Sequence, residues 1–311
     1  MRAVQVTQPG GPVEVRDIEE PTPGPDDVLI EVHRVGVSFP DLLLSQGRYQ
    51  LKPEPPFTLG VDFAGTVVSG PGFDVGQRVA AVLPYGGAAE RVACPRQFVF
   101  PLPDSISYDE GAALPMNYLT ALFALQERGQ VRPGEIVLIH GAAGGVGTAA
   151  IQVARGLRAE TVAVVSSDAK EAMARRAGAD RVVRTDDLAS AGRVDLVLDV
   201  VGGDALTDSL RLLNPQGRLL VVGFAAGQGI PEVKVNRLLL NNIDVRGVGW
   251  GAFAMAQQDY MQQQWRELEP MLAEGTVKPP IGATYSLDEF GVALAEMQER
   301  RTLGKSVVVV R

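Results

Sequence analysis

The chain has 311 residues, roughly twice the length of a typical domain, so we expect two domains with separate cores. Hydrophobic residues make up 46% and charged residues 21%, which excludes a disordered or fibrous protein. The net charge is 29 − 37 = −8 and the basic residues are scattered, which argues against a nucleic-acid-binding protein.

Cysteine content and hydropathy indicate a compartment. Cys94 is the only cysteine, which excludes an internal disulfide and a metal site built from several thiolates. No apolar run approaches the roughly 18 residues needed to cross a bilayer, and residues 1–11 lack the apolar centre of a signal peptide. We therefore expect a soluble cytoplasmic protein that has no membrane partner.

The first third of the chain alternates short β-like runs with proline and glycine. The runs are Ala3 to Val6, Val13 to Ile18, Val28 to Val37 and Ala64 to Gly70. This spacing predicts an antiparallel, barrel-like domain, with Pro21 to Asp27 as a loop inside it.

From about Tyr118 the pattern changes to near-continuous apolar strands that alternate with helices. Strands buried on both faces, with helices between them, predict a doubly wound parallel sheet of the nucleotide-binding type. Residues 255–275 then predict one glutamine-rich amphipathic helix, followed by a short strand, a helix at Leu287 to Arg300 and a strand at Ser306 to Arg311.

Because this tail mixes strands and helices, we expect it to rejoin the first domain. The predicted α/β organisation is a β-rich domain of residues 1–117 and 253–311 and a dinucleotide-binding domain of residues 118–252.

The segment from Ile136 to Gly147 reads as a strand followed by a tight glycine turn, and a helix begins directly after it. Glycines let the backbone approach a pyrophosphate, and the helix N-terminus offers free N–H groups to it. The usual first glycine of the motif is replaced by Ala142. We expect the cofactor to be bound by Ala143, Gly144, Gly145, Val146 and Gly147.

The end of the next strand bears on the choice of nicotinamide cofactor. An NAD enzyme usually has a carboxylate there for the ribose 2′-hydroxyl, but this strand ends in Val165, Ser166 and Ser167. Ser166, Ser167 and Lys170 can instead donate to a 2′-phosphate, with Arg184 adding positive charge. Asp168 is the residue that favours NAD. We predict NADPH.

Two later strands of the same domain end in further candidate residues. Open α/β sheets bind ligands beyond the carboxyl ends of their strands. The cofactor candidates there are Gly223, Phe224, Val248 and Gly249.

Several motifs together resemble the zinc-independent quinone oxidoreductases, including the zeta-crystallin-like proteins, of the medium-chain dehydrogenase/reductase superfamily. The motifs are VGVSFPDLLLSQGRYQ (residues 35–50), LGVDFAGTV (59–67), NYLTA (117–121), GAAGGVG (141–147) and the terminal LGKSVVVV. The resemblance implies a GroES-like catalytic domain, an inserted Rossmann domain and a homodimer.

The resemblance also bears on metal binding. Zinc-dependent members of the superfamily have a cysteine where this chain has Ser38 and a histidine where it has Val61. Neither side chain is a zinc ligand, and one cysteine cannot form a four-cysteine zinc lobe. We expect no metal.

The same resemblance supplies candidate catalytic residues. Tyr49 matches a tyrosine that lines the substrate cleft in quinone reductases and donates a proton in related enoyl thioester reductases. Thr120 matches a threonine that faces the nicotinamide, and Ser38 replaces the usual asparagine of this branch. The alternatives are a packing role for Tyr49 and a backbone hydrogen bond within its helix for Thr120. Asp41 matches an aspartate for which we expect a structural, orienting role.

Without a Lewis acid, hydride transfer to an acceptor that is already electron-poor is favoured over alcohol oxidation. We therefore predict an NADPH-dependent enzyme that reduces a quinone or another electron-poor small molecule. One alternative is a reductase of enoyl thioesters or other α,β-unsaturated carbonyl compounds. The other is an NADPH-binding protein with little turnover.

Overall fold

Two units divide the chain in the computed structural model, which describes all residues from 1 to 311. Unit 1 contains Met1–Met116 and Ile281–Arg311, and unit 2 contains Asn117–Pro280. The first boundary lies within one residue of the predicted one. The second differs, because residues 253–280 belong to unit 2 and not to the β-rich unit.

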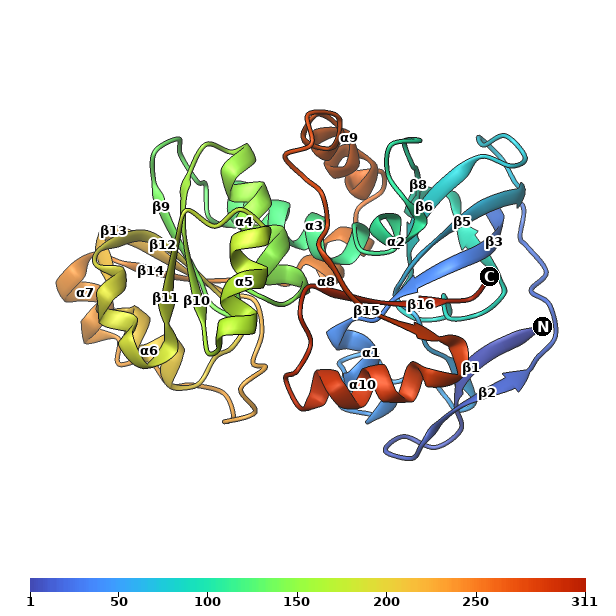
Figure 1. Cartoon of the computed structure of the whole chain (residues 1–311), viewed down its shortest axis with the longest axis horizontal. Helices are drawn as coiled ribbons and strands as arrows, with labels where there is room; N and C mark the ends of the chain where they lie inside the picture. Colours follow the sequence, from blue (N-terminus) through green and yellow to red (C-terminus); the bar gives the residue numbers. More distant parts are fainter. The chain divides into compact units, whose positions relative to one another are not determined.

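Unit 1 is built on a seven-stranded sheet in the order β15-β16-β3-β5-β6-β8, in which β7 also pairs with β3, and on a smaller sheet β2-β1-β4 (Figure 1). All pairs are antiparallel except β15 with β16, as the short, punctuated strands predict. The strands are β1 (Arg2–Val6), β2 (Val13–Asp17), β3 (Asp27–Gly36), β4 (Phe57–Thr58), β5 (Asp62–Ser69), β6 (Arg78–Val82), β7 (Arg91–Pro95), β8 (Val99–Pro101), β15 (Ile281–Ser286) and β16 (Lys305–Val309).

Three helices complete unit 1: α1 (Phe39–Ser45), α2 (Tyr108–Gly111) and α10 (Phe290–Gln298). The predicted C-terminal helix begins as a 3₁₀ turn at Leu287–Glu289 before it becomes α10. Alternate residues of β3 and β5 point to one core, which also receives Leu44 of α1 and Phe290 of α10. Residues 281–311 are therefore part of unit 1, whereas residues 253–280 of the predicted C-terminal part are not.

Unit 2 contains a six-stranded parallel sheet in the order β11-β10-β9-β12-β13-β14. Helices α4 and α5 cover one face and α6 and α7 the other, which confirms the doubly wound prediction (Figure 1). The strands are β9 (Ile136–Ile139), β10 (Glu160–Val165), β11 (Arg181–Arg184), β12 (Val194–Asp199), β13 (Leu213–Val221) and β14 (Asp244–Gly247).

Seven α-helices lie wholly or partly in unit 2. They are α3 (Pro115–Leu122, which begins in unit 1), α4 (Gly145–Gly156), α5 (Asp168–Arg176), α6 (Asp204–Ser209), α7 (Asn236–Asn241), α8 (Trp250–Met255) and α9 (Tyr260–Ala273). A π-helical segment, Phe123–Arg128, continues α3, and a 3₁₀ segment, Thr185–Ala191, follows β11.

The glutamine-rich segment forms one helix, α9, as predicted for residues 255–275, but the helix begins five residues later, because residues 256–259 are not helical and Met255 is the last residue of α8. Asp259 adopts a left-handed conformation with φ of 60°, which separates α8 from α9. Helix α9 is held by unit 2, since Gln264 Nε2 donates to the carbonyl of Leu119 at 3.2 Å and Met271 packs against Gly156. These contacts place this part of the tail in unit 2.

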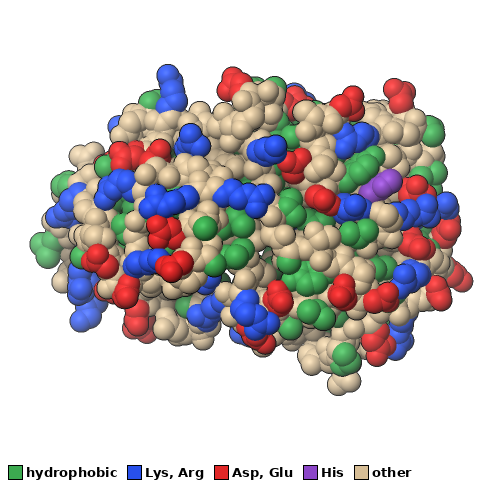
Figure 2. Space-filling model, in the orientation of Figure 1, with side chains coloured by type: hydrophobic (Ala, Val, Ile, Leu, Met, Phe, Trp, Pro, Cys, Tyr) green, Lys and Arg blue, Asp and Glu red, His purple; other side chains and the backbone are tan.

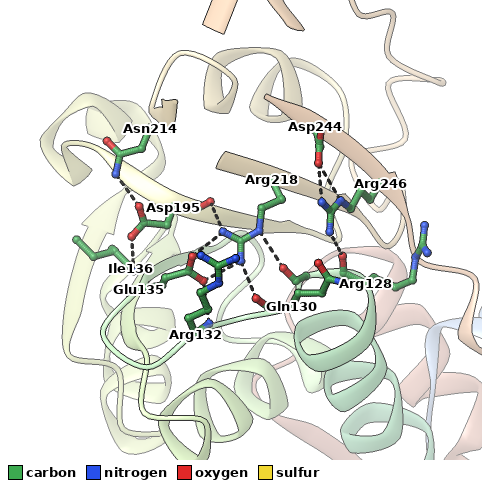
Figure 3. A network of polar contacts seen from close by, with 11 residues as sticks. Arg128, Gln130, Arg132, Glu135, Ile136, Asp195, Asn214, Arg218, Asp244 and Arg246 are labelled. Atoms are coloured by element: carbon green, nitrogen blue, oxygen red, sulfur yellow. Dashed lines mark hydrogen bonds and ion pairs between the residues drawn. The ribbon is translucent and has the colours of Figure 1, made fainter. Parts of the chain in front are cut away.

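A buried polar network anchors the sheet of unit 2 near the amino ends of its strands (Figure 3). Arg218 of β13 binds the carboxylate of Glu135 through two nitrogens, at 2.8 and 2.7 Å, and donates to the carbonyls of Gly129 and Gln130. Asp195 accepts the N–H of Ile136 at 2.9 Å. The network ties the segment before β9 to the neighbouring strands, at the end of the sheet opposite the glycine loop.

Acidic and basic side chains are intermixed over the face shown in Figure 2, with no extended basic patch there. None of the helices is both long and apolar enough to serve as a membrane-spanning segment.

Candidate active site

The glycine loop connects β9 to α4 in unit 2. Gly141 turns the chain with φ of +61°, and its carbonyl accepts the N–H of Gly144 at 3.0 Å. The left-handed residue that opens the loop is thus Gly141, one position before Ala142. A glycine is therefore present where the turn requires it, and Ala142 is buried without needing a positive φ.

The start of α4 is packed too closely for side chains. A methyl group built on Gly147 would lie 2.2 Å from the carbonyl oxygen of Gly141. A methyl group on Gly145 would lie 2.6 Å from Nδ2 of Asn117. The first turn of α4 also leaves the N–H groups of Gly145, Val146 and Gly147 without carbonyl partners in the helix. These groups suit the oxygens of a pyrophosphate.

Helix α3 presents two polar residues on one face of unit 2. Asn117 and Thr120 are three residues apart, so they share a helix face, and Asn117 reaches the start of α4. Tyr118 instead points into unit 2, where its hydroxyl donates to Gln152 Oε1 at 2.7 Å. Gln152 also bonds the backbone of Lys278, so Tyr118 has a structural role in unit 2.

Three of the predicted phosphate-binding residues converge at the carboxyl end of β10. The ammonium of Lys170 donates to the hydroxyl of Ser166 at 3.1 Å. Ser167 caps α5, because its hydroxyl accepts the N–H of Lys170 at 3.4 Å. Ser166 and Ser167 are exposed. One ammonium, one exposed hydroxyl and the start of a helix therefore face the same region.

The structure gives Arg184 a different environment from the one expected. Its guanidinium pairs with the carboxylate of Asp168 and with that of Glu171 at 3.0 Å. Its charge is therefore already balanced by two carboxylates. The same pairing places a positive charge beside Asp168, but the Asp168 side chain is 99% exposed, so the pairing offsets only part of the repulsion between Asp168 and a 2′-phosphate.

The other strand ends of unit 2 carry the remaining candidates. Gly223 and Phe224 follow β13, and the ring of Phe224 packs beside Gly202. Val248 and Gly249 follow β14, and the N–H of Val248 donates to the carbonyl of Val221 at 2.9 Å. All these residues lie at carboxyl ends of the parallel strands, the edge where ligands bind in such sheets.

Asp199, at the end of β12, holds the loop that follows this strand. Its carboxylate accepts the N–H groups of Val201 at 2.7 Å and Gly202 at 3.0 Å. His140, which precedes the glycine loop, bonds the Ser209 hydroxyl at 2.6 Å, and burial lowers the pKa of its imidazole. The side chains of both residues are buried and hold the neighbouring loops in place.

In unit 1, Ser38 lies in a buried polar cluster. Its hydroxyl donates to Asp62 Oδ2 at 3.0 Å and accepts a hydrogen bond from the ammonium of Lys305 at 2.6 Å. Lys305 also donates to Asp62 Oδ2 at 2.6 Å. The exposed fractions of the Lys305 and Asp62 side chains are 3% and 0%, so water screens this ion pair little.

Asp41 lies beside the same cluster. Its carboxylate accepts the N–H groups of Ser38 and Gly60, both at 2.9 Å, which fixes the start of α1 and the turn before β5. Burial raises the pKa of Asp41 to about 7, although these two hydrogen bonds and the charge of Lys305 oppose the shift. The contacts agree with the orienting role predicted for Asp41.

Tyr49 lies after α1 and packs part of its ring against the core of unit 1. The residue is only partly buried, and burial together with the charge of Asp41 raises the pKa of its hydroxyl. A phenol in this state stays protonated at neutral pH and can donate a hydrogen bond.

Two of these residues were not singled out from the sequence. Asp62 and Lys305 are 243 positions apart, and each is the charged residue of a largely apolar strand. The sequence could have indicated this pair, because a charged residue inside an apolar strand is rarely fully buried unless it has a partner of opposite charge.

The donor set of unit 1 does not fit zinc. Ser38 and Val61 stand at the two expected ligand positions, and the thiol of Cys94 is buried in β7 with its pKa raised by burial. No three His, Cys, Asp or Glu side chains are grouped so that they could hold a metal ion. The cation beside Ser38 is an ammonium.

Comparison with known proteins agrees with the two-unit architecture. Residues 24–104 match the family described as alcohol dehydrogenase GroES-like domain, and residues 145–274 match the family described as zinc-binding dehydrogenase. A bovine quinone oxidoreductase-like protein 2 is 36% identical over 94% of this chain and 89% of its own length.

Two solved structures extend the likeness. A probable oxidoreductase from Mycobacterium abscessus is 40% identical over 99% of this chain and 98% of its own, with a TM-score of 0.89. The quinone oxidoreductase from Thermus thermophilus, which was also solved in complex with NADPH, is 34% identical over 100% of both chains, with a TM-score of 0.86. This chain therefore belongs to the quinone oxidoreductase-like proteins of the medium-chain dehydrogenase/reductase superfamily.

Proposed function

We propose that the protein is an NADPH-dependent reductase that transfers hydride to a quinone without a metal. The observation that carries the proposal is the convergence of Lys170 and Ser166 at the end of the strand next to the glycine loop strand, with Asp168 paired to Arg184. An ammonium and an exposed hydroxyl at this strand end suit a 2′-phosphate better than a 2′-hydroxyl. The NADPH complex of the Thermus relative supports the same cofactor.

In unit 2, the N–H groups of Gly145 to Gly147 would bind the pyrophosphate, together with Ala143 and Gly144 of the loop. Ser166, Ser167 and Lys170 would bind the 2′-phosphate, while Phe224 and Val248 would pack against the cofactor. Thr120 would face the nicotinamide. NADPH, when bound, supplies the hydride and carries the redox chemistry.

In unit 1, Tyr49 and Ser38 would act on the acceptor. Both carry hydroxyl groups that can donate to an acceptor oxygen, and the raised pKa of Tyr49 keeps its proton in place at neutral pH. Because no side-chain set here fits a Lewis-acidic metal, an acceptor that is electron-poor before binding suits the site.

We also propose a homodimer. Unit 2 exposes Ile230, Val235, Leu239 and Leu240 with exposed fractions of 73%, 76%, 76% and 74%, next to the edge strand β14. An apolar cluster beside an unpaired edge is typical of an interface with a second copy. Sedimentation of the wild type against Leu240→Arg tests this, and a wild-type monomer would contradict it.

The activity test follows the absorbance of reduced nicotinamide with purified protein and a panel of quinones. The comparison acceptor is a short enoyl thioester, and the best acceptor is repeated with NADH. Fast, NADPH-selective oxidation with a quinone is the expected result. Turnover with the enoyl thioester alone would indicate the related reductase activity, and tight NADPH binding without any turnover would indicate a binding protein.

A further inference from the structure

Strand register in unit 1 brings three distant residues together around Gly36. In the sheet, Gly36 pairs with Asp62 of β5 and with Val307 of β16. Ser38 follows Gly36 by two residues and Lys305 precedes Val307 by two. A methyl group built on Gly36 would lie 2.5 Å from Cε of Lys305, so the glycine leaves the space that the lysine side chain occupies.

The Lys305–Asp62 pair is not explained by stability alone. Removing two charges from water is costly, and apolar residues of similar volume often serve a core equally well. Both oxygens of the Asp62 carboxylate accept hydrogen bonds: Oδ1 from the N–H of Met116 at 2.8 Å, and Oδ2 from the Ser38 hydroxyl and the Lys305 ammonium. The carboxylate holds the ammonium in one place, and the ammonium contacts a hydroxyl.

The orientation of Ser38 gives this contact a chemical consequence. Lys305 donates to the hydroxyl oxygen at 2.6 Å, which makes the hydroxyl hydrogen more acidic and a stronger donor. That hydrogen points to Asp62 at 3.0 Å, but a hydroxyl rotates freely about its C–O bond. If it turns to an acceptor oxygen, Asp62 Oδ2 keeps the hydrogen bond from Lys305 at 2.6 Å.

We propose that Lys305, held by Asp62, is a positioning residue that polarises the Ser38 hydroxyl, which then stabilises the negative charge formed on the acceptor oxygen. The inference rests on the proposed reductase function. In the reaction, the nicotinamide C–H bond breaks and the hydride passes with its electron pair to the acceptor. The nicotinamide is oxidised, the acceptor is reduced, and the resulting oxyanion takes a proton from water.

Asp41 agrees with this electrostatic arrangement. Its carboxylate accepts the backbone N–H groups of Ser38 and Gly60, and burial raises its pKa to about 7. A carboxyl group that is protonated in part at neutral pH opposes the charge of Lys305 less than a fully ionised one.

The test compares Lys305→Met, Ser38→Ala and the combined variant, with NADPH and a series of quinones of different reduction potential. We expect each single variant to lower kcat by on the order of 100-fold, as when one donor to a developing oxyanion is removed. The NADPH dissociation constant, measured by fluorescence, should stay unchanged. The combined variant should be no slower than Ser38→Ala, because Lys305 acts through that hydroxyl.

The quinone series separates polarisation from a purely structural role. Loss of an electrophilic hydrogen bond should slow the least electron-poor quinones most, so that the slope of log kcat against reduction potential becomes steeper. A packing defect would lower kcat by the same factor for every quinone. Lys278→Met, which removes an exposed ammonium in unit 2, is the matched control.

Lys305→Met leaves Asp62 buried without its counter-ion and can fail to fold for that reason. The variant Lys305→Met with Asp62→Asn removes both charges, and we expect the same loss in kcat and the same steeper slope. The inference would be overturned if the fold-losses in kcat of Ser38→Ala and Lys305→Met multiplied in the combined variant, or if the slope of log kcat against reduction potential did not change. Either result would leave the proposed reductase function standing. A wild type that reduces no acceptor would contradict the proposed function, and this inference with it.

Discussion

Replacement of Lys170 by alanine should convert an NADPH-selective protein into one that discriminates poorly. NADPH differs from NADH only in its 2′-phosphate, and the Lys170 ammonium lies 3.1 Å from the Ser166 hydroxyl, so both groups would bind that phosphate in the proposed complex. Arg184 cannot substitute for it without leaving Asp168 and Glu171. The Lys170→Ala variant should therefore bind NADPH more weakly and bind NADH almost as well as the wild type does.

The size of the loss follows from the exposure of the site. A hydrogen bond to a charged group contributes roughly 1.5 to 3 kcal/mol, and salt and water reduce this at a partly exposed position. With Lys170 half-buried, about 1 to 2 kcal/mol remains, which corresponds to a change of about 5- to 30-fold in the NADPH Michaelis constant. The NADH constant should change by less than about twofold.

The assay measures initial rates with each cofactor at a fixed, saturating quinone concentration. Lys278→Ala, which removes an exposed lysine elsewhere in unit 2, is the control. Raising the ionic strength should weaken the NADPH preference of the wild type more than that of Lys170→Ala. Equal changes in the two Michaelis constants would refute the assignment of Lys170 to the phosphate.

Three further predictions concern the Tyr49 hydroxyl, the glycine loop and the polar network of unit 2. Tyr49→Phe should lower kcat by at least about tenfold and leave the fluorescence-measured NADPH affinity intact, and an unchanged kcat would make Tyr49 a packing residue. Gly147→Ala should lower the free energy of unfolding by about 1 to 3 kcal/mol because its methyl group meets Gly141, whereas Gly144→Ala, with 3.4 Å to the same oxygen, should cost less in urea denaturation. Arg218→Met should destabilise unit 2 by up to about 3 kcal/mol at pH 7, since it leaves Glu135 partly buried without a partner. Partial burial alone would raise the pKa of Glu135, but the hydrogen bonds and charge of Arg218 lower it below the ordinary value of 4.5. The stabilisation is therefore present above about pH 4.5 and is lost as the pH falls through the lowered pKa, and a loss of stability in Arg218→Met that does not depend on pH would contradict this account.

The periodicity of apolar residues predicted the fold of both units, because the buried strands of unit 2 and the alternating strands of unit 1 depend on local pattern alone. The errors lie where tertiary contacts decide. The break between α8 and α9 depends on the left-handed conformation of Asp259, which no strong local signal such as glycine marks. The assignment of α9 to unit 2 depends on the contacts of Gln264 and Met271 with residues more than 100 positions earlier.

The candidate site shows the same division between local and distant information. The glycine loop and the Ser166 to Lys170 segment are contiguous, so their geometry could be predicted from sequence. The pairing of Arg184 with Asp168 was missed because it joins the start of α5 to the end of β11, 16 residues apart, and it changes the expected role of Arg184. The environment of Ser38 depends on Lys305, 267 positions away, and on the register of two strand pairs.

The kind of cation beside Ser38 bears on the direction of the proposed reaction. A zinc ion binds an alcohol oxygen directly and lowers its pKa, so it favours alkoxide formation and alcohol oxidation. The ammonium of Lys305 carries one charge, balanced by Asp62 at 2.6 Å, and reaches a ligand only through a hydrogen-bonded hydroxyl. Such an arrangement can stabilise an oxyanion that hydride addition creates, but it supplies little driving force to ionise an alcohol. The polar cluster of unit 1 therefore matches acceptor reduction, in which the electron deficiency of the acceptor provides what a metal would otherwise contribute.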